Sequence, residues 1–262
     1  MKYPIIKRSF YALASEPAFI FCIVLELAVL LFLVFGVEFQ LYQGEVVSIT
    51  ILGSRIDSPS LFVNMMLPNF VGLVITIIVF LFILVSGTVY PGLADDPILN
   101  IVLTRAVTRS GFLLSNIVGA GAAGSVNVLI FLLSMSLVMT LKTGIWFMTN
   151  ALGGAAALSV LLIVILSLTV FFGATGGSAT TSQVLVILIH FVLSGLIHSP
   201  NLNKNILFKA VSLIVPSTDR VSMSVQSTLL GYPLEISVLV QPLLVALVCI
   251  VGSVVIFEKK DL

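Results

Sequence analysis

Charged side chains are scarce in this chain, and their scarcity excludes most soluble architectures. Only 9% of the 262 residues are Asp, Glu, Lys or Arg, whereas soluble domains carry about 25%. A surface that faces water needs more charge than this, so lipid must be the solvent for most of the chain. The net charge of +1 also argues against nucleic acid as a partner.

Residues that could carry chemistry are equally few. Cys22 and Cys249 lie inside apolar runs and cannot form a disulfide framework. His190 and His198 have no Cys, Asp or Glu near them in sequence, so no metal-ligand spacing is met. No phosphate-binding loop of the form GxxxxGK[ST] is present. We therefore expect no catalytic residue, metal or cofactor in this chain. An intramembrane protease is a minor alternative, because Ser194-Gly195 lacks the first glycine of a nucleophile motif.

What the chain does have is long apolar runs. Six windows approach or exceed the roughly 20 residues that a membrane-spanning helix needs, so the sequence predicts an all-α membrane protein with one transmembrane domain over residues 1–262. The fifth window is short and could extend back through Thr180, and the third is longer than a membrane requires. The windows are about Ala18–Val37, Asn64–Ser86, Phe112–Leu141, Ala151–Phe172, Ser182–Ile197 and Ser237–Phe257.

The residues before the first window predict an amphipathic helix. Ile6, Phe10 and Leu13 recur at helical spacing, and the basic pair Lys7-Arg8 falls off that stripe. Such a helix would lie at the cytoplasmic membrane interface. The alternative is a frayed basic tail that only sets topology. No cleavage site follows the first window, so we interpret it as a retained span rather than a signal peptide.

Lys and Arg, which favour the cytoplasmic side, set the expected orientation. With both termini inside, seven of the 12 basic residues lie inside and five outside, and the inside segments are shorter in total. We therefore expect an N-in, C-in topology. The inside residues are Lys2, Lys7, Arg8, Arg105, Arg109, Lys259 and Lys260, and the outside residues are Arg55, Lys142, Lys204, Lys209 and Arg220.

Two longer segments then lie outside. In Glu38–Val63, apolar and polar residues alternate around Val47–Leu52, a pattern that predicts a short hairpin. In His198–Ile236, the apolar run Leu207–Val215 is too short to span, and it is typical of a helix in or dipping into the outer interface.

Two ionisable residues inside the windows are candidates for a translocation path. Glu26 lies near the middle of the first window, where an ionised carboxylate costs a few kcal/mol, so it should face protein or water, or be protonated. The alternative role is a helix–helix hydrogen bond, with His190, Ser134, Ser136 and Thr76 as candidate partners by depth. His190 lies in the fifth window and has the same two interpretations.

The segment between the second and third windows is the most informative one. Asp96 can cap a helix and Pro97 fits its first position. Apolar residues then recur in a loop that water should otherwise cover, and an exposed apolar patch of this kind predicts a docking surface. The residues of this predicted helix and its basic end are Asp96, Pro97, Ile98, Ile101, Val102, Leu103, Arg105 and Arg109.

This stretch resembles the cytoplasmic signature of permeases of the type-2 ABC (ATP-binding-cassette) exporter family. That signature has Asp-Pro, a short apolar helix, Ser/Thr-Arg-Pro-Val-Ser-Arg and an apolar start containing Gly-Lys and a further Gly. Ala106 stands where the family has Pro, and Asn116 stands where it has Lys. The similar stretches are Asp96-Pro97, Thr104–Arg109, Phe112–Gly119, Val215–Asp219 and Phe257–Leu262.

The resemblance implies a permease that pairs with a second permease chain, as a homodimer, and docks two separate ATPase subunits that bind ATP. It makes the 96–103 segment a coupling helix and the apolar pieces between the last two spans outer re-entrant helices. A bacterial inner membrane is the expected location. Few charges line the spans, so a lipid, a peptide or a hydrophobic compound is compatible as cargo. A proton-coupled secondary transporter that uses Glu26 is the main alternative, followed by an intramembrane enzyme.

Overall fold

The computed structural model describes residues 3–42, 45–56, 67–89, 108–144, 148–176, 178–197, 211–229 and 231–259. Six of its helical segments are long and apolar enough to cross a membrane, so the chain is a multi-pass membrane protein, as the windows predict. These segments are α2 (Pro17–Leu31) continued by the π-helical turn η1 (Phe32–Gly36), α4 (Leu67–Val89), α6 (Arg109–Thr143), α7 (Met148–Ala174), α8 (Ala179–Ile187) continued by η4 (Leu188–Leu193) and α9 (Ser194–Ile197), and α12 (Ile236–Lys259).

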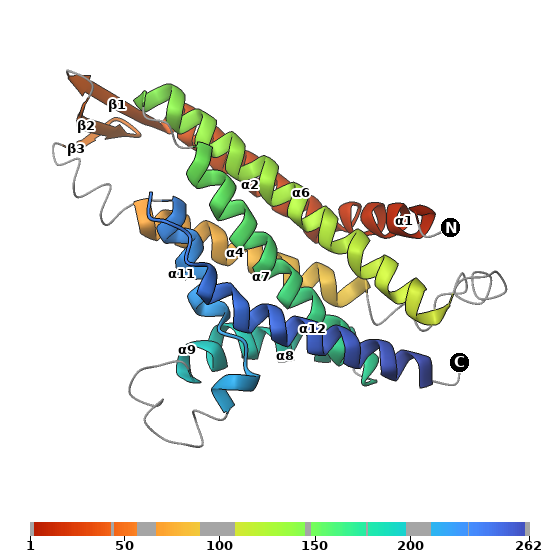
Figure 1. Cartoon of the computed structure of the whole chain (residues 1–262). Coiled ribbons are helices and arrows are strands. Elements are labelled where there is room, and N and C mark those ends of the chain that lie inside the picture. Colours follow the sequence, from red (N-terminus) through yellow and green to blue (C-terminus); the bar gives the residue numbers. More distant parts are fainter. Residues whose placement is uncertain are drawn as a thin grey trace.

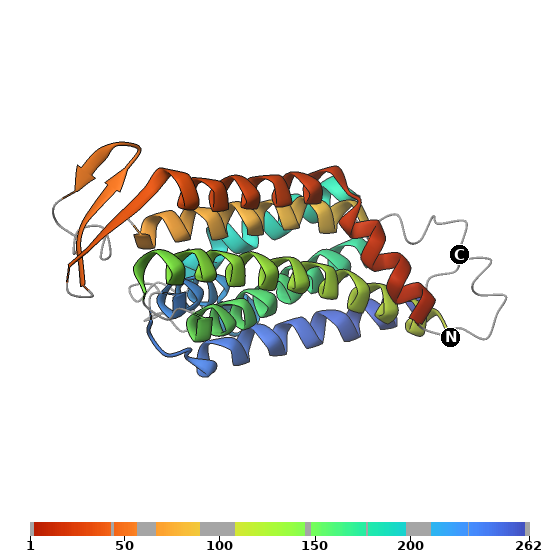
Figure 2. The ribbon, with the colours of Figure 1, turned by 90° about the horizontal axis from the view of Figure 1, so that it is seen from above.

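The six segments run side by side in a bundle (Figures 1 and 2). Both ends of the chain lie at one end of this bundle, and a small β-sheet lies at the opposite end. We call these the terminal end and the sheet end. α7 is the central helix, since it packs against α4, α6, α8 and α12. An even number of spans with both termini at one end agrees with the expected alternation of the chain across the membrane.

Two of the helices, α6 and α8, start where a side chain caps their backbone rather than where apolar composition begins. The Thr108 side chain accepts a hydrogen bond from the Gly111 N–H at 3.1 Å and begins α6. Gly144, with φ of 73°, ends it. The resulting 35 residues reach about 52 Å at 1.5 Å per residue, so α6 exceeds the hydrocarbon core, which is about 30 Å thick. Ser178 caps α8 in the same way, which brings the fifth span back to Ala179.

The helix expected at the N-terminus is present as α1 (Tyr3–Ala14) and packs across the start of α6. Its buried line is Ile5, Ser9 and Leu13, whereas Ile6 and Phe10 are only half-buried beside it. The observed line of buried residues is therefore shifted by one residue from the predicted stripe of Ile6, Phe10 and Leu13, with Leu13 common to both. The reason is Ser9, whose hydroxyl donates to the Asn116 carbonyl of α6 at 2.8 Å and so tolerates burial.

The segment after the first span forms the hairpin that its alternation predicts, extended by a third strand. β1 (Val37–Tyr42), β2 (Glu45–Ile51) and β3 (Ser54–Ile56) make an antiparallel sheet in that order. Leu52 and Gly53 both have positive φ, 47° and 84°, as in the two-residue turns that match the twist of a hairpin. The described part of the chain is thus mainly helical, with one small sheet.

The sheet is held to the bundle by an apolar cluster and by one cation. Leu33 of η1, Val37 of β1 and Ile49 of β2 are all buried together. Lys142, near the end of α6, donates to the carbonyls of Val34 and Val37. The Val34 carbonyl belongs to the last turn of η1, where the backbone leaves acceptors unpaired, and the Val37 carbonyl belongs to the start of β1. Lys142 therefore ties the junction of the first span and the sheet to α6.

Between the fifth and sixth spans the structure describes α11 (Thr218–Leu229), which lies at the sheet end. It packs mainly against α7 and buries Val221 and Val225 completely. At 12 residues it is too short to cross a membrane. Of the predicted interfacial helix Leu207–Val215, residues 207–210 lie outside the described residues, whereas residues 211–214 are helical and the Val215 N–H donates to the Val211 carbonyl at 3.0 Å. Leu213 and Ile214 are exposed there.

Candidate functional site

The predicted docking segment is described only at its end. Asp96, Pro97, Ile98, Ile101, Val102, Leu103 and Arg105 lie outside the described residues. Arg109 is the first residue of α6 and is half-buried there. The flanking ends are informative, because α4 finishes and α6 begins at the terminal end of the bundle (Figures 1 and 2). The connection between them therefore starts and finishes on the side of both termini.

Glu26, the first candidate for a translocation path, lies inside the protein. Its side chain is 5% exposed and accepts a hydrogen bond from Asn127 Nδ2 at 2.8 Å, which joins α2 to α6. The Cys22 thiol, one helical turn earlier, lies 3.5 Å from the same carboxylate oxygen. This placement agrees with the expectation from desolvation that the carboxyl group turns away from lipid.

The partners expected for Glu26 were wrong. Thr76 instead donates to the Gly72 carbonyl of its own helix at 2.7 Å. Neither His190, Ser134 nor Ser136 bonds to the carboxylate. Asn127 was missed because depth in the membrane orders residues along a span but says nothing about which face of the span they occupy. The available signal was that Asn127 is an amide inside an otherwise apolar window.

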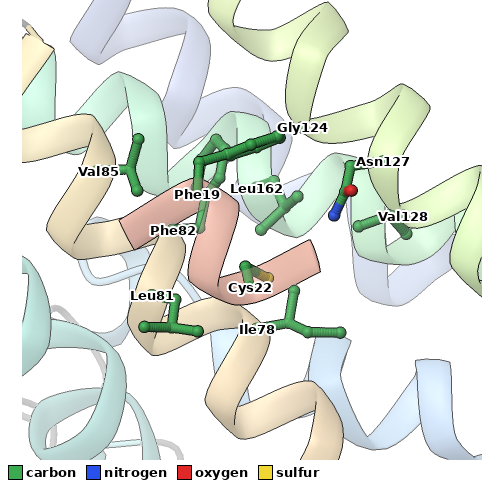
Figure 3. A pocket seen from close by; sticks show the side chains of 10 residues that line it. All are labelled: Phe19, Cys22, Ile78, Leu81, Phe82, Val85, Gly124, Asn127, Val128 and Leu162. Atoms are coloured by element: carbon green, nitrogen blue, oxygen red, sulfur yellow. The ribbon is translucent and has the colours of Figure 1, made fainter. Parts of the chain in front are cut away.

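A small cavity lies between α2, α4, α6 and α7 beside this pair (Figure 3). Phe19, Cys22, Phe82, Asn127 and Leu162 are among the residues that line it, and the surface they expose to it is apolar. Its free volume is about 10 Å³, which is near the lower limit for one water molecule. A cavity this small and apolar cannot hold a substrate, and it offers a water molecule no polar partners.

Gly124 keeps this region closed. A Cβ atom there would come within 2.7 Å of the Phe82 ring and 3.3 Å of Leu162, so α6 approaches α4 and α7 as closely as its backbone allows. The small-residue spacing Ala120-x-x-x-Gly124 therefore acts as a packing surface, as such patterns do in membrane helices. A path for cargo does not pass between these three helices in the described conformation.

His190, the second candidate, lies in the π-helical turn η4 and is 7% exposed. Its ring stands edge-on to Phe191 with centroids 4.5 Å apart, and its Nδ1 atom has no hydrogen-bond partner among the described residues. π-helical turns inside spans are frequent at functional sites. His190 and Glu26 are not hydrogen-bonded to each other, so the structure does not join the two candidates into one site.

A polar cluster at the sheet end was missed by sequence reasoning. The Ser194 hydroxyl donates to the Asp219 carboxylate at 2.5 Å and accepts from the Asp219 N–H at 3.1 Å. Gln241 of α12 accepts from the Ser217 N–H and hydroxyl, at 2.9 and 2.8 Å, and donates to the Val215 carbonyl at 2.8 Å. These bonds tie the fifth and sixth spans to the start of α11. The motif Ser217-Thr218-Asp219 is a helix-start signal that could have located α11.

The Ser194 bonds also bear on the protease alternative. A serine nucleophile needs its hydroxyl proton to pass to a base such as histidine. Here that proton is given to Asp219. Among the residues that the structure describes, no three His, Cys, Asp or Glu side chains are close enough to hold a metal ion.

No protein-family model matches the chain, and no curated protein matches it in sequence. Membership of the ABC exporter family therefore stays a prediction that rests on the motif and on the arrangement of the spans.

Proposed function

We propose that this chain is the membrane subunit of an ATP-driven ABC exporter, which forms a translocation path with a second permease chain and takes its energy from separate ATPase subunits. The observation that carries the proposal is where the 90–107 connection is attached. It bears the motif that resembles a coupling helix, and its two described ends lie beside both termini. Docking surface and termini would then share the cytoplasmic side of a bacterial inner membrane.

Other features of the chain support this role. α1 lies at the same end of the bundle as the end of α4 and the start of α6, and it is hydrogen-bonded to α6, the helix that follows the docking segment in sequence. A displacement of the docking segment would be transmitted directly to the 35-residue α6, since α6 begins at Arg109, just after this segment. We assign α11 and its polar links to the outer end, where the family has its re-entrant helices.

The proposed path lies between two chains rather than within one. The cavity between α2, α4, α6 and α7 has a free volume of only about 10 Å³, and the helices around it are in close contact at Gly124. The second permease chain would be a copy of this one, because a homodimer needs no further gene product. Alternating access would then change the contact between the two bundles.

Docking can be tested by changing apolar residues of the 96–103 segment. The two variants are Leu103→Asp and Val102→Asp, each made in the tagged full-length chain and purified from native membranes. Both should lower the amount of ABC ATPase that co-purifies with the chain, and with it the ATP hydrolysis of the purified sample. Leu52→Asp is the matched control, since Leu52 is 76% exposed at the sheet end. It should leave recovery unchanged. Equal recovery in all three variants would contradict the docking assignment.

Topology can be tested independently with single cysteines that replace Arg55 in β3 and Lys259 at the end of α12. In intact cells, an impermeant maleimide should label position 55 and not position 259. The reverse result would place the termini outside and remove the docking segment from the ATPase side.

A second candidate function is favoured by one observation, the buried Glu26–Asn127 pair. It is proton-coupled transport, in which the carboxyl group would gain and lose a proton. Glu26→Gln preserves hydrogen bonding but cannot titrate. An exporter driven by ATP should keep transport in reconstituted vesicles, whereas a proton-coupled transporter that uses Glu26 should fold normally and lose it.

A further inference from the structure

The exposed side of α1 combines positive charge with an aromatic side chain. Around the helix, Ile5, Ser9 and Leu13 face the protein, Ile6 and Phe10 are half-buried, and Lys7 and Tyr11 are exposed. Lys7 Nζ lies 5.9 Å from the centre of the Tyr11 ring. The accessible side of α1 is therefore apolar at Ile6 and Phe10 and cationic at the neighbouring Lys7.

These side chains enclose a shallow groove. It is lined by Ile6, Lys7, Phe10 and Tyr11 and has a free volume of about 240 Å³, which is the space of several water molecules at about 30 Å³ each. One side is apolar, and the other carries an ammonium group and a phenol hydroxyl. No acidic residue occurs in α1, and Glu16, just beyond its end, is half-buried.

The depth of this groove follows from the chain. Only Ser15 and Glu16 separate the end of α1 from the start of the first span at Pro17. α1 must therefore lie where that span enters the bilayer, at the level of the lipid headgroups. Its rotation is also fixed, because a Cβ atom on Gly119 would come within 2.5 Å of the Ile6 carbonyl oxygen, so α1 and α6 touch through their backbones.

We propose that this groove binds an anionic phospholipid, with the phosphate held by Lys7 and Tyr11 and the start of an acyl chain packed on Ile6 and Phe10. Charge complementarity identifies this occupant. An ammonium group and a hydroxyl donor suit a phosphate oxygen, and basic residues at the membrane surface attract anionic lipids. Tyrosine is typical at this depth because its ring prefers the interface and its hydroxyl prefers water. The site does not depend on the proposed transport function.

Native mass spectrometry of the full chain can test the site, with phosphatidylglycerol and phosphatidylcholine as the probes. The wild type should retain phosphatidylglycerol in preference. Lys7→Gln should lower its retention about fivefold, the value expected for the loss of one basic side chain at an anionic surface. Tyr11→Ala should lower it as well. Both side chains are exposed, so both variants should keep the thermal stability of the wild type.

Lys259→Gln is the matched control. It removes the same charge at the same end of the molecule, from an exposed position at the end of α12, and should change retention less than twofold. Equal losses in Lys7→Gln and Lys259→Gln would overturn the site in favour of diffuse attraction. Equal retention of the two lipids by the wild type would also overturn it. Displacement of the lipid by millimolar inorganic phosphate would show a site for free anions instead.

Discussion

α7 and α2 are both spans, but they are held in the molecule in different ways. In the most apolar part of α7, 67% of the residues are buried inside the protein, against 22% for the first span. Large apolar side chains of α2, such as Phe21, Val24 and Leu27, are more than half exposed and would face lipid or a second chain. Yet α2 carries Glu26, the one acidic side chain that is buried among the residues that the structure describes.

The difference shows what positions a helix in a membrane. Lipid tails are as apolar as leucine, so exposed apolar side chains give α2 little reason to prefer one neighbour or rotation over another. A polar contact supplies that preference, since an unpaired carboxyl group in hydrocarbon is costly. α7 needs no such contact, because close packing on nearly all sides already fixes it.

The largest expected effect comes from removing packing around α7. Leu161→Ala should lower the free energy of unfolding by about 2–4 kcal/mol, because Leu161 is fully buried and its loss leaves a cavity. Leu27→Ala makes the same chemical change on α2, where Leu27 is 54% exposed, and should cost under about 0.5 kcal/mol. Unfolding in mixed detergent micelles measures both. Equal losses would mean that burial in the monomer does not separate the two helices.

A smaller effect tests the contact of α1, which like α2 has one buried side. Gly119→Ala places a Cβ atom 2.5 Å from the Ile6 carbonyl oxygen, and it should cost about 1–2 kcal/mol through displacement of α1. Gly121→Ala is the control, because its Cβ atom meets only ordinary contacts at 3.8 Å. It should be neutral or stabilising, since alanine favours helix. The same unfolding assay would contradict this assignment if Gly119→Ala were as stable as Gly121→Ala.

The next smaller effect concerns the hydrogen bond between Glu26 of α2 and Asn127 of α6. Glu26→Ala should cost about 1 kcal/mol, in the range measured for hydrogen bonds between membrane helices, because it leaves the Asn127 amide unpaired beside a nearly closed cavity. Glu26→Gln should cost less, since its amide oxygen still accepts from Asn127. A double-mutant cycle with Asn127→Ala isolates the pair. A coupling energy of zero would remove the proposed role of Glu26 in positioning α2.

Sequence alone predicted the number of spans, their order and the N-terminal helix, because apolar length and helical periodicity are local properties. It predicted span ends less well. The 35-residue length of α6 depends on caps at Thr108 and Gly144 that composition does not weigh. The stripe of α1 was displaced because Ser9 looks exposed in sequence and is buried through a bond to Asn116.

The candidate site was predicted only in part, because its remaining contacts join helices that are distant in sequence. The cost of placing a carboxyl group in hydrocarbon was enough to predict that Glu26 faces protein. Its partner depends on how α2 and α6 are rotated and how far each slides along the other. These are set by the packing of several helices, including the contact of Gly124 of α6 with Phe82 of α4. The cluster of Ser194, Asp219 and Gln241 joins three segments that are distant in sequence, and no local pattern encodes that meeting.

The smallest expected effect concerns a polar contact inside the well-packed region. The hydroxyls of Ser86 on α4 and Thr169 on α7 lie 3.2 Å apart, and both are fully buried. Each hydroxyl also lies within hydrogen-bond distance of a carbonyl of its own helix, Ile83 at 3.1 Å and Ile165 at 2.9 Å. A hydroxyl has only one proton, so at most one of the two can donate across the helix interface. Ser86→Ala therefore leaves Thr169 able to donate to Ile165 and should cost under about 0.5 kcal/mol. If Ser86→Ala cost more than Glu26→Ala in the same unfolding assay, polar contacts would be holding α7 as well as α2, and the contrast between the two spans would fail.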